Sequence, residues 1–224
     1  MRWLDLLFAH WPVPADALRP LVPPELELDL YDGVAWVGVV PFRMEGVAPR
    51  GLPDVPGMSA FPELNLRLYV RHGGKPGVWF LSLDAANPLA VWTAQIVFHL
   101  PYVRARIALI REGDAIDYRC VRSAAPAGLR FEGRYRPSGA PYVAEPGTLE
   151  HALTERYCLY ARSPRGALYR TDIHHRPWPL QPAEAEVRVN ELGRPHNLLF
   201  EGAPPLVHFS RRLDVVAWGL ERIA

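Results

Sequence analysis

Short runs of apolar, β-branched and aromatic residues recur along the chain and are separated by glycine and proline. This pattern is typical of β-strands bounded by turns. We predict strands over residues 33–42, 64–70, 77–84, 104–110, 115–123, 129–136, 167–175, 185–192 and 206–218. At least nine strands with few helices predict a mainly β fold, either a barrel or a sandwich with helices packed on it.

Three segments carry helix signals. Residues 14–22 begin with a proline and an acidic first turn, and residues 87–98 have Asn87 as N-cap and Pro88 at the first helical position. Residues 148–160 have Thr148 as a cap and an apolar stripe. No internal repeat or long linker interrupts the pattern, so we predict one domain over residues 1–224. The Gly/Pro-rich segment 43–61 has the length of a functional loop or lid.

Composition narrows the function classes. Hydrophobic residues make up 49% of the 224, and the net charge is +1 without a block of like charge. This balance predicts neither a nucleic-acid partner nor an anionic membrane, and no run is long enough for a transmembrane helix. The apolar N-terminus lacks the features of a signal peptide.

Cys120 and Cys158 lack a partner motif and indicate buried thiols in a reducing cytoplasm. Many prolines and few thermolabile residues suggest a heat-loving source.

The strand-like segment 63–71 has two chemically different faces. Its even-numbered leucines and Val70 fall on one face, and Glu63, Asn65, Arg67, Tyr69 and Arg71 fall on the other. Such a polar face belongs either to a solvated surface strand or to the lining of a cavity inside a closed barrel. In the second case a carboxyl, an amide and a guanidinium would converge on a ligand.

Two further segments offer candidate binding residues. Tyr102 and Arg104 repeat with period two after Pro101, and an interior arginine would suit a carboxylate ligand by bidentate pairing. The alternative is a surface strand with its arginines in solvent. Of the adjacent His174 and His175, which point to opposite strand faces, one is expected to be structural or a lone acid/base group. No spacing of histidines or cysteines matches a metal site, so we predict no metal and no cofactor.

Amine chemistry has few candidates in this chain. The 25 basic residues are 24 arginines and one lysine, and arginine forms no Schiff base. The single Lys75 lies in the sequence HGGKPG, which predicts a hairpin turn with the lysine exposed near its tip. Motifs of serine hydrolases, P-loop proteins and dinucleotide-binding proteins are absent from the sequence.

The chain resembles an uncharacterised bacterial family, the YqjF-like proteins of the acetoacetate decarboxylase-like superfamily. The resemblance is carried by the runs LLFAHWPVPADALRPLVPPELELDLYDGVAWVGVVPFRM, FPELNLRLYVRHGGKPGVWFLSLDA, LTERYCLY, HHRPWPLQPA and HFSRRLDVVAW. It covers essentially the whole chain. The superfamily implies a curved β-barrel or cone around a central pocket, with about three peripheral helices, and homo-oligomers.

The resemblance also implies which residues line that pocket. The reactive lysine pair of the decarboxylases follows a proline that is similar to Pro101, so the pair falls on Tyr102 and Val103, and both amines are lost. The pocket glutamate is similar to Glu63, and an N-terminal pocket arginine aligns loosely with Arg2. Tyrosine forms no imine, and decarboxylation of a β-keto acid needs an electron sink. We therefore expect the pocket to be kept without the lysine-dependent reaction.

Three hypotheses follow. The first is a cytoplasmic small-molecule-binding protein or an enzyme of unassigned reaction, whose pocket is lined by Arg2, Glu63, Asn65, Arg67, Tyr102, Arg104 and His174 and takes a ligand such as a carboxylate. The second is a non-catalytic scaffold or interaction protein on the same fold, with the barrel filled by side chains. The third, ranked last, is a decarboxylase-like enzyme that acts on a keto acid through Lys75.

Overall fold

The structure, a computed structural model, describes residues 1–48, 59–123, 128–200 and 202–224. Its strands are β1 (Arg2–Val13), β2 (Glu27–Leu28), β3 (Ala35–Glu45), β4 (Phe61–His72), β5 (Lys75–Ala85), β6 (Tyr102–Glu112), β7 (Ala115–Arg122), β8 (Arg130–Pro137), β9 (Cys158–Arg162), β10 (Leu168–His175), β11 (Gln181–Asn190), β12 (Leu206–Ala217) and β13 (Glu221–Arg222). The α-helices are α1 (Ala15–Leu18), α2 (Pro88–Phe98) and α3 (Leu149–Thr154), with short 3₁₀ turns η1 (Arg19–Leu21) and η2 (Arg194–His196).

Each of the nine predicted strands corresponds to an observed one, and α2 begins at Pro88 as predicted. Thr148 caps α3 by accepting a hydrogen bond from the His151 backbone N–H. The two-residue turn between β4 and β5 confirms the predicted hairpin, with Lys75 as the first residue of β5. Of the predicted loop 43–61, the part from 49 to 58 lies outside the described residues.

Two of the predicted helices are shorter than the sequence indicates. Residues 14–22 form only the four-residue α1 followed by η1. The helix predicted over 148–160 ends at Thr154, and Cys158–Arg162 forms strand β9 between β5 and β10. The reason is burial on both sides of this segment, because Cys158, Leu159, Tyr160 and Ala161 are all buried in succession. Such a run carries no period by which a helix and a strand can be told apart.

The strand pairings close two rings that share a wall. The 13-stranded sheet follows the order β13-β10-β9-β5-β6-β7-β8-β11-β12-β1-β3-β4-β2, with additional pairings β10–β12 and β5–β4. Ring A therefore runs through β12, β1, β3, β4, β5, β9 and β10. Ring B runs through β12, β1, β3, β4, β5, β6, β7, β8 and β11. The five strands common to both form the shared wall.

The central strands of the shared wall, β1, β3 and β4, are buried on both faces over most of their length, and each face packs on a different core. One core, which includes Leu7, Leu66, Tyr118 and Phe131, fills ring B and extends toward α1. The other lies within ring A and includes residues such as Leu6, Phe8, Val40, Phe42 and Trp178. Because successive residues of a strand point to opposite faces, the leucines of β4 face ring B and its polar residues face ring A.

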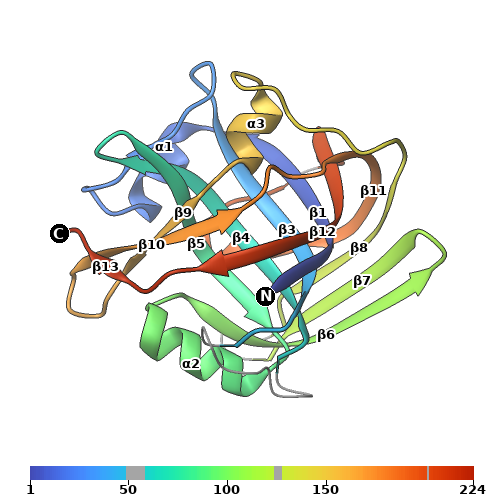
Figure 1. The fold of residues 1–224 in the computed structure, drawn as a ribbon, viewed down its shortest axis with the longest axis horizontal. Helices are drawn as coiled ribbons and strands as arrows, with labels where there is room; N and C mark the ends of the chain where they lie inside the picture. The colour runs from blue at the N-terminus through green and yellow to red at the C-terminus, as the bar shows by residue number, and fades with distance from the viewer. Residues whose placement is uncertain (49–58, 124–127, 201) are drawn as a thin grey trace.

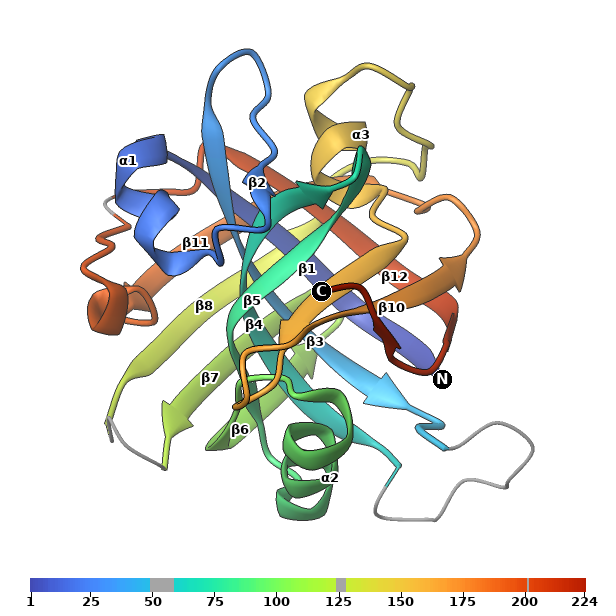
Figure 2. The ribbon, with the colours of Figure 1, turned by 90° about the vertical axis from the view of Figure 1, so that its left-hand side faces the viewer.

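The helices lie at the ends of the strands rather than between them. Figures 1 and 2 both show α1 and α3 at one end of the rings and α2 at the opposite end. This leaves the interior of ring A enclosed mainly by strands, with α3 close to one opening. No helix among the described residues has the length and apolar character needed to cross a membrane.

Candidate functional site

A hydrogen-bonded cluster forms around Glu63 on the ring A face of β4. The Tyr102 hydroxyl, at the start of β6, donates to Glu63 Oε2 over 2.8 Å, and the Asn65 side chain also hydrogen-bonds to this carboxyl. From the ring B side, the Tyr118 hydroxyl donates to the Glu63 backbone carbonyl over 2.8 Å. Glu63 is only 2% exposed. Residues of three strands, β4, β6 and β7, therefore fix the position of one buried carboxyl group.

Burial makes this carboxyl a weaker acid than an exposed glutamate. Removal from water raises the pKa of Glu63 from 4.5 to about 8, against the opposing hydrogen bonds from Tyr102 and Asn65, and nearby Asp84 raises it further. Burial and the adjacent Glu63 also raise the pKa of Tyr102 well above its ordinary value. Near neutral pH the cluster is therefore an uncharged carboxylic acid beside an uncharged phenol. A protonated carboxyl can donate a hydrogen bond to a ligand.

Arg67 lies on the same face of β4, four residues after Glu63. Its Nε donates to the Tyr69 hydroxyl over 3.2 Å, and its terminal nitrogen donates to the Leu153 carbonyl over 3.1 Å. The guanidinium lies 5.1 Å from the Phe8 ring centroid, within the range of a cation–π contact. Among the described residues, no carboxylate pairs with this buried cation, whereas the buried Arg122 and Arg156 each pair with an aspartate.

His10 of β1 extends this polar chain. Its Nε2 is 2.5 Å from the Tyr69 hydroxyl, which already accepts from Arg67. Tyr69 must therefore donate to Nε2, which leaves the imidazole proton on Nδ1. Burial, then Arg67 and His208, lower the pKa of His10 well below its ordinary value, so that the ring is neutral. The guanidinium is thus the charged group of the His10–Tyr69–Arg67 chain.

Gly38 of β3 makes room for this chain. It is the register partner of both His10 and Arg67. A Cβ atom at this position would be 2.9 Å from the Tyr69 hydroxyl and 3.3 Å from Arg67 Cγ. Glycine is required here by the close approach of side chains and not by its backbone dihedral angles.

Several buried polar atoms that face ring A have no hydrogen-bond partner among the described residues. They include Trp3 Nε1, Asn65 Oδ1, His10 Nδ1, His208 Nδ1 and Ser210 Oγ. The last two belong to β12, at positions that pair with Phe8 and Leu6 of β1 and so face the same core. An unsatisfied buried polar atom costs about 1–3 kcal/mol. Several of them on one interior face indicate a place where a ligand or water supplies the missing partners.

The other candidate residues lie away from this cluster. Arg2 is partly exposed at the start of β1 and pairs with Glu45 over 3.4 Å. Arg104 and His174 are exposed on β6 and β10. His175 is the buried member of the histidine pair, with its ring stacked on Tyr157 at 4.5 Å. The structure thus brings Glu63, Asn65, Arg67 and Tyr102 to one face, and Arg2, Arg104 and His174 do not join them.

Lysine chemistry has no support at this site. The Lys75 ammonium is 2.8 Å from an Asp172 carboxylate oxygen at the partly exposed start of β5. The positions after Pro101 hold a phenol and a valine.

Among the residues that the structure describes, no group of three or more His, Cys, Asp or Glu side chains is arranged to hold a metal ion.

Comparison with known proteins places the chain in a family. A family model described as "Uncharacterized conserved protein" (DUF2071) matches residues 1–214. The chain belongs to the DUF2071 family. It is 48% identical over 220 residues to the uncharacterized protein YqjF of Bacillus subtilis (strain 168), covering 98% of this chain and 90% of that protein. The resemblance to YqjF-like proteins is therefore confirmed.

Solved structures support the fold of this DUF2071 protein. The enduracididine biosynthesis enzyme MppR, complexed with the condensation product of pyruvate and imidazole 4-carboxaldehyde, has a TM-score of 0.70 at 16% identity, covering 99% of this chain and 87% of its own. Acetoacetate decarboxylase from Legionella pneumophila has a TM-score of 0.62 at 16% identity, covering 100% and 87%. These likenesses confirm the mainly β, acetoacetate decarboxylase-like fold.

Proposed function

We propose that this protein binds a small organic carboxylate inside ring A. Arg67 is the counter-ion for the carboxylate, and the Glu63–Tyr102 pair holds a second polar group of the ligand, with Glu63 available as a general acid or base. The observation that carries the proposal is the buried Arg67 guanidinium, which no carboxylate of the described residues neutralises. A buried charge without a counter-ion is costly, and a ligand carboxylate would remove that cost.

The spacing of the two groups indicates the kind of ligand. Glu63 and Arg67 are four residues apart on one strand, which separates their Cα atoms by about 13 Å. Both side chains point to the ring A face, and Asn65 lies between them with its Oδ1 unpartnered. A ligand with a carboxylate at one end and an oxygen acceptor several bonds away would contact both groups. A relative in fold, MppR, is described in complex with pyruvate.

Titration calorimetry with defined acids tests the proposal. The probes are pyruvate and levulinate, each with its neutral amide as a comparison. We expect the acids to bind and the amides not to bind. Arg67→Met should weaken binding by at least about tenfold, the effect of losing a charge-assisted hydrogen bond of 1.5–3 kcal/mol. Arg71→Met is the matched control, because Arg71 lies on the same strand but is exposed and paired with Asp29.

Two results would contradict the proposal. Equal affinity for acid and amide would remove the role of Arg67 as counter-ion. Absence of binding by every probe to the folded wild-type protein would favour the scaffold alternative, in which side chains alone fill ring A. Arg67→Gln serves as a second variant if Arg67→Met does not fold, since the amide can still donate to the Tyr69 hydroxyl and the Leu153 carbonyl.

A further inference from the structure

The sheet divides along β5, where the two rings separate. On one edge of β5, Val78 and Trp79 pair in parallel with β9, and residues 83–85 pair in parallel with β6. Neither strand pairs with the intervening residues 80–82. In Figure 1, β9 continues toward β10 and ring A, whereas β6 continues toward β7 and ring B. Crevices form where neighbouring parallel strands diverge, and ligands bind preferentially at such points.

A pocket of about 310 Å³ lies at this fork, outside both rings. Its floor includes Phe80 and Leu81 of β5, and Leu81 is the extra residue at a register shift against β4. Tyr160 and Arg162 line it from the β9 side, and His99 lines it from the approach to β6. Such a volume is at the lower end of the range found for small-molecule sites. The pocket shares no residue with the Glu63 cluster or the His10–Tyr69–Arg67 chain.

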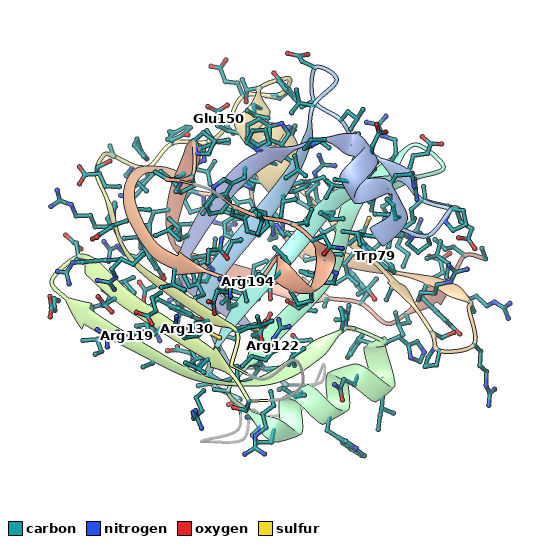
Figure 3. All side chains as sticks on the ribbon, turned by 180° about the vertical axis from the view of Figure 1, so that it is seen from behind. Trp79, Arg119, Arg122, Arg130, Glu150 and Arg194 are labelled. Carbon is teal, nitrogen blue, oxygen red and sulfur yellow. The ribbon has the colours of Figure 1, made fainter. Side chains whose placement is uncertain are left out.

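The lining combines aromatic rings with imidazoles whose nitrogens form no hydrogen bond to the described residues. Trp79, Phe80 and Tyr160 supply aromatic surface, and the Trp79 indole is fixed by donating to the Leu21 carbonyl over 3.1 Å. Figure 3 shows Trp79 beside the segment that contains α1. His99 and His196 also line the pocket, and no hydrogen bond joins either imidazole to another described residue. Free imidazole nitrogens beside aromatic walls are groups that fix the orientation of a ligand.

The charges around the pocket indicate a neutral ligand. The Arg162 guanidinium lies 2.9 Å from Glu25, so its charge is already compensated. Burial and Arg122 lower the pKa of His196, which favours the neutral imidazole. We propose that the fork pocket, defined by Leu21, Trp79, Phe80, His99, Tyr160 and His196, is a second ligand site that takes a compact, neutral aromatic molecule with one hydrogen-bonding group, of the phenol or indole class.

Calorimetric titration with indole and with phenol tests this site in the full chain. We expect saturable binding of at least one probe. His196→Gln should weaken it about 3- to 10-fold, the loss of one hydrogen bond, and Leu21→Trp should abolish it by filling the pocket. His174→Gln is the matched control, because it changes an exposed histidine elsewhere on the chain.

Arg67→Met distinguishes this inference from the proposed function. It should weaken carboxylate binding in ring A and leave indole binding unchanged. Loss of indole binding in Arg67→Met but not in Leu21→Trp would place the aromatic ligand in ring A and overturn the fork site. Absence of saturable binding by both indole and phenol to the wild-type chain would also overturn it. Binding that survives both His196→Gln and Leu21→Trp would do the same.

Discussion

Glu63 carries the most informative titration in the molecule. Its pKa is raised from the ordinary 4.5 to about 8, with burial as the largest cause. In the unfolded chain the carboxyl releases its proton near the ordinary value, whereas the folded protein keeps it up to about pH 8. Folding therefore takes up a proton between these pH values. The contribution to stability is fully present below about pH 4.5 and is lost as the pH rises toward 8.

Glu63→Gln should remove this pH dependence. An amide cannot ionise, so the free energy of unfolding of the variant relative to wild type should rise with pH. The slope should approach 1.4 kcal/mol per pH unit between about pH 5 and 8. Above pH 8 the difference should be constant. Urea unfolding of both proteins at pH 5, 6, 7, 8 and 9 measures it.

Glu45→Gln is the control for this experiment. Glu45 lies on β3, is 30% exposed and pairs with Arg2 and Arg43. Its substitution should not reproduce the rising difference. If the difference between Glu63→Gln and wild type stays flat from pH 5 to 8, the buried carboxyl is ionised throughout, and it cannot donate a hydrogen bond to a ligand.

The sequence located part of the site for a physical reason. Glu63, Asn65 and Arg67 alternate with leucines, and alternation is visible wherever the two faces of a strand differ in chemistry. It does not show which polar residues are enclosed, so Arg104 shares its period with Tyr102 and is nevertheless exposed. His10 could not be found this way, because β1 is buried on both faces and has no alternation.

The same limit applies to whole elements. β1 and β9 line ring A, are mostly apolar and are buried on both sides over most of their length. Strands of this kind read as continuous hydrophobic runs. The strands of ring B that face solvent, such as β7 and β11, alternate clearly and were predicted from their pattern. Sequence periodicity therefore predicted the outer strands more completely than the wall around the candidate site.

A buried ion pair joins β5 to β7 across ring B. Arg122 donates to both Asp84 carboxylate oxygens over 2.7 Å and to the Ser82 hydroxyl over 2.9 Å. Both charged side chains are at most 4% exposed. Breaking such a pair leaves one uncompensated buried charge, which costs about 3–5 kcal/mol, whereas replacing both partners by apolar residues is often nearly neutral.

This contrast gives an element-scale prediction. Arg122→Met should lower the free energy of unfolding by about 3–5 kcal/mol. The double variant Asp84→Leu/Arg122→Met should be more stable than the sum of the two single changes predicts. Urea unfolding of the four proteins completes a double-mutant cycle. Arg119→Met is the matched control, because Arg119 is also on β7 but is 59% exposed in its ion pair, and Figure 3 shows it at the outside of the molecule. Additive effects of Asp84→Leu and Arg122→Met would contradict this account.

At the scale of the whole molecule, the two rings depend on one wall. Ring B covers the face of β4 that carries Leu64, Leu66 and Leu68, and ring A covers the face that carries Glu63 and Arg67. Loss of the strands unique to either ring would expose a continuous apolar face or a buried charged one. Neither ring can therefore open fully without destabilising the other, which is the physical basis for expecting a single domain.

Hydrogen exchange measured by mass spectrometry tests this expectation. Strands β9 and β10 occur only in ring A, and β7 and β8 occur only in ring B. If the chain unfolds as one cooperative unit, the slowest amides of both pairs should report the same free energy of opening, within about 1 kcal/mol. This agreement should persist as urea is added below the unfolding midpoint. Two separate values, with one pair of strands exchanging through its own opening, would show that the rings are independent folding units. The shared wall would then belong to the more stable ring alone.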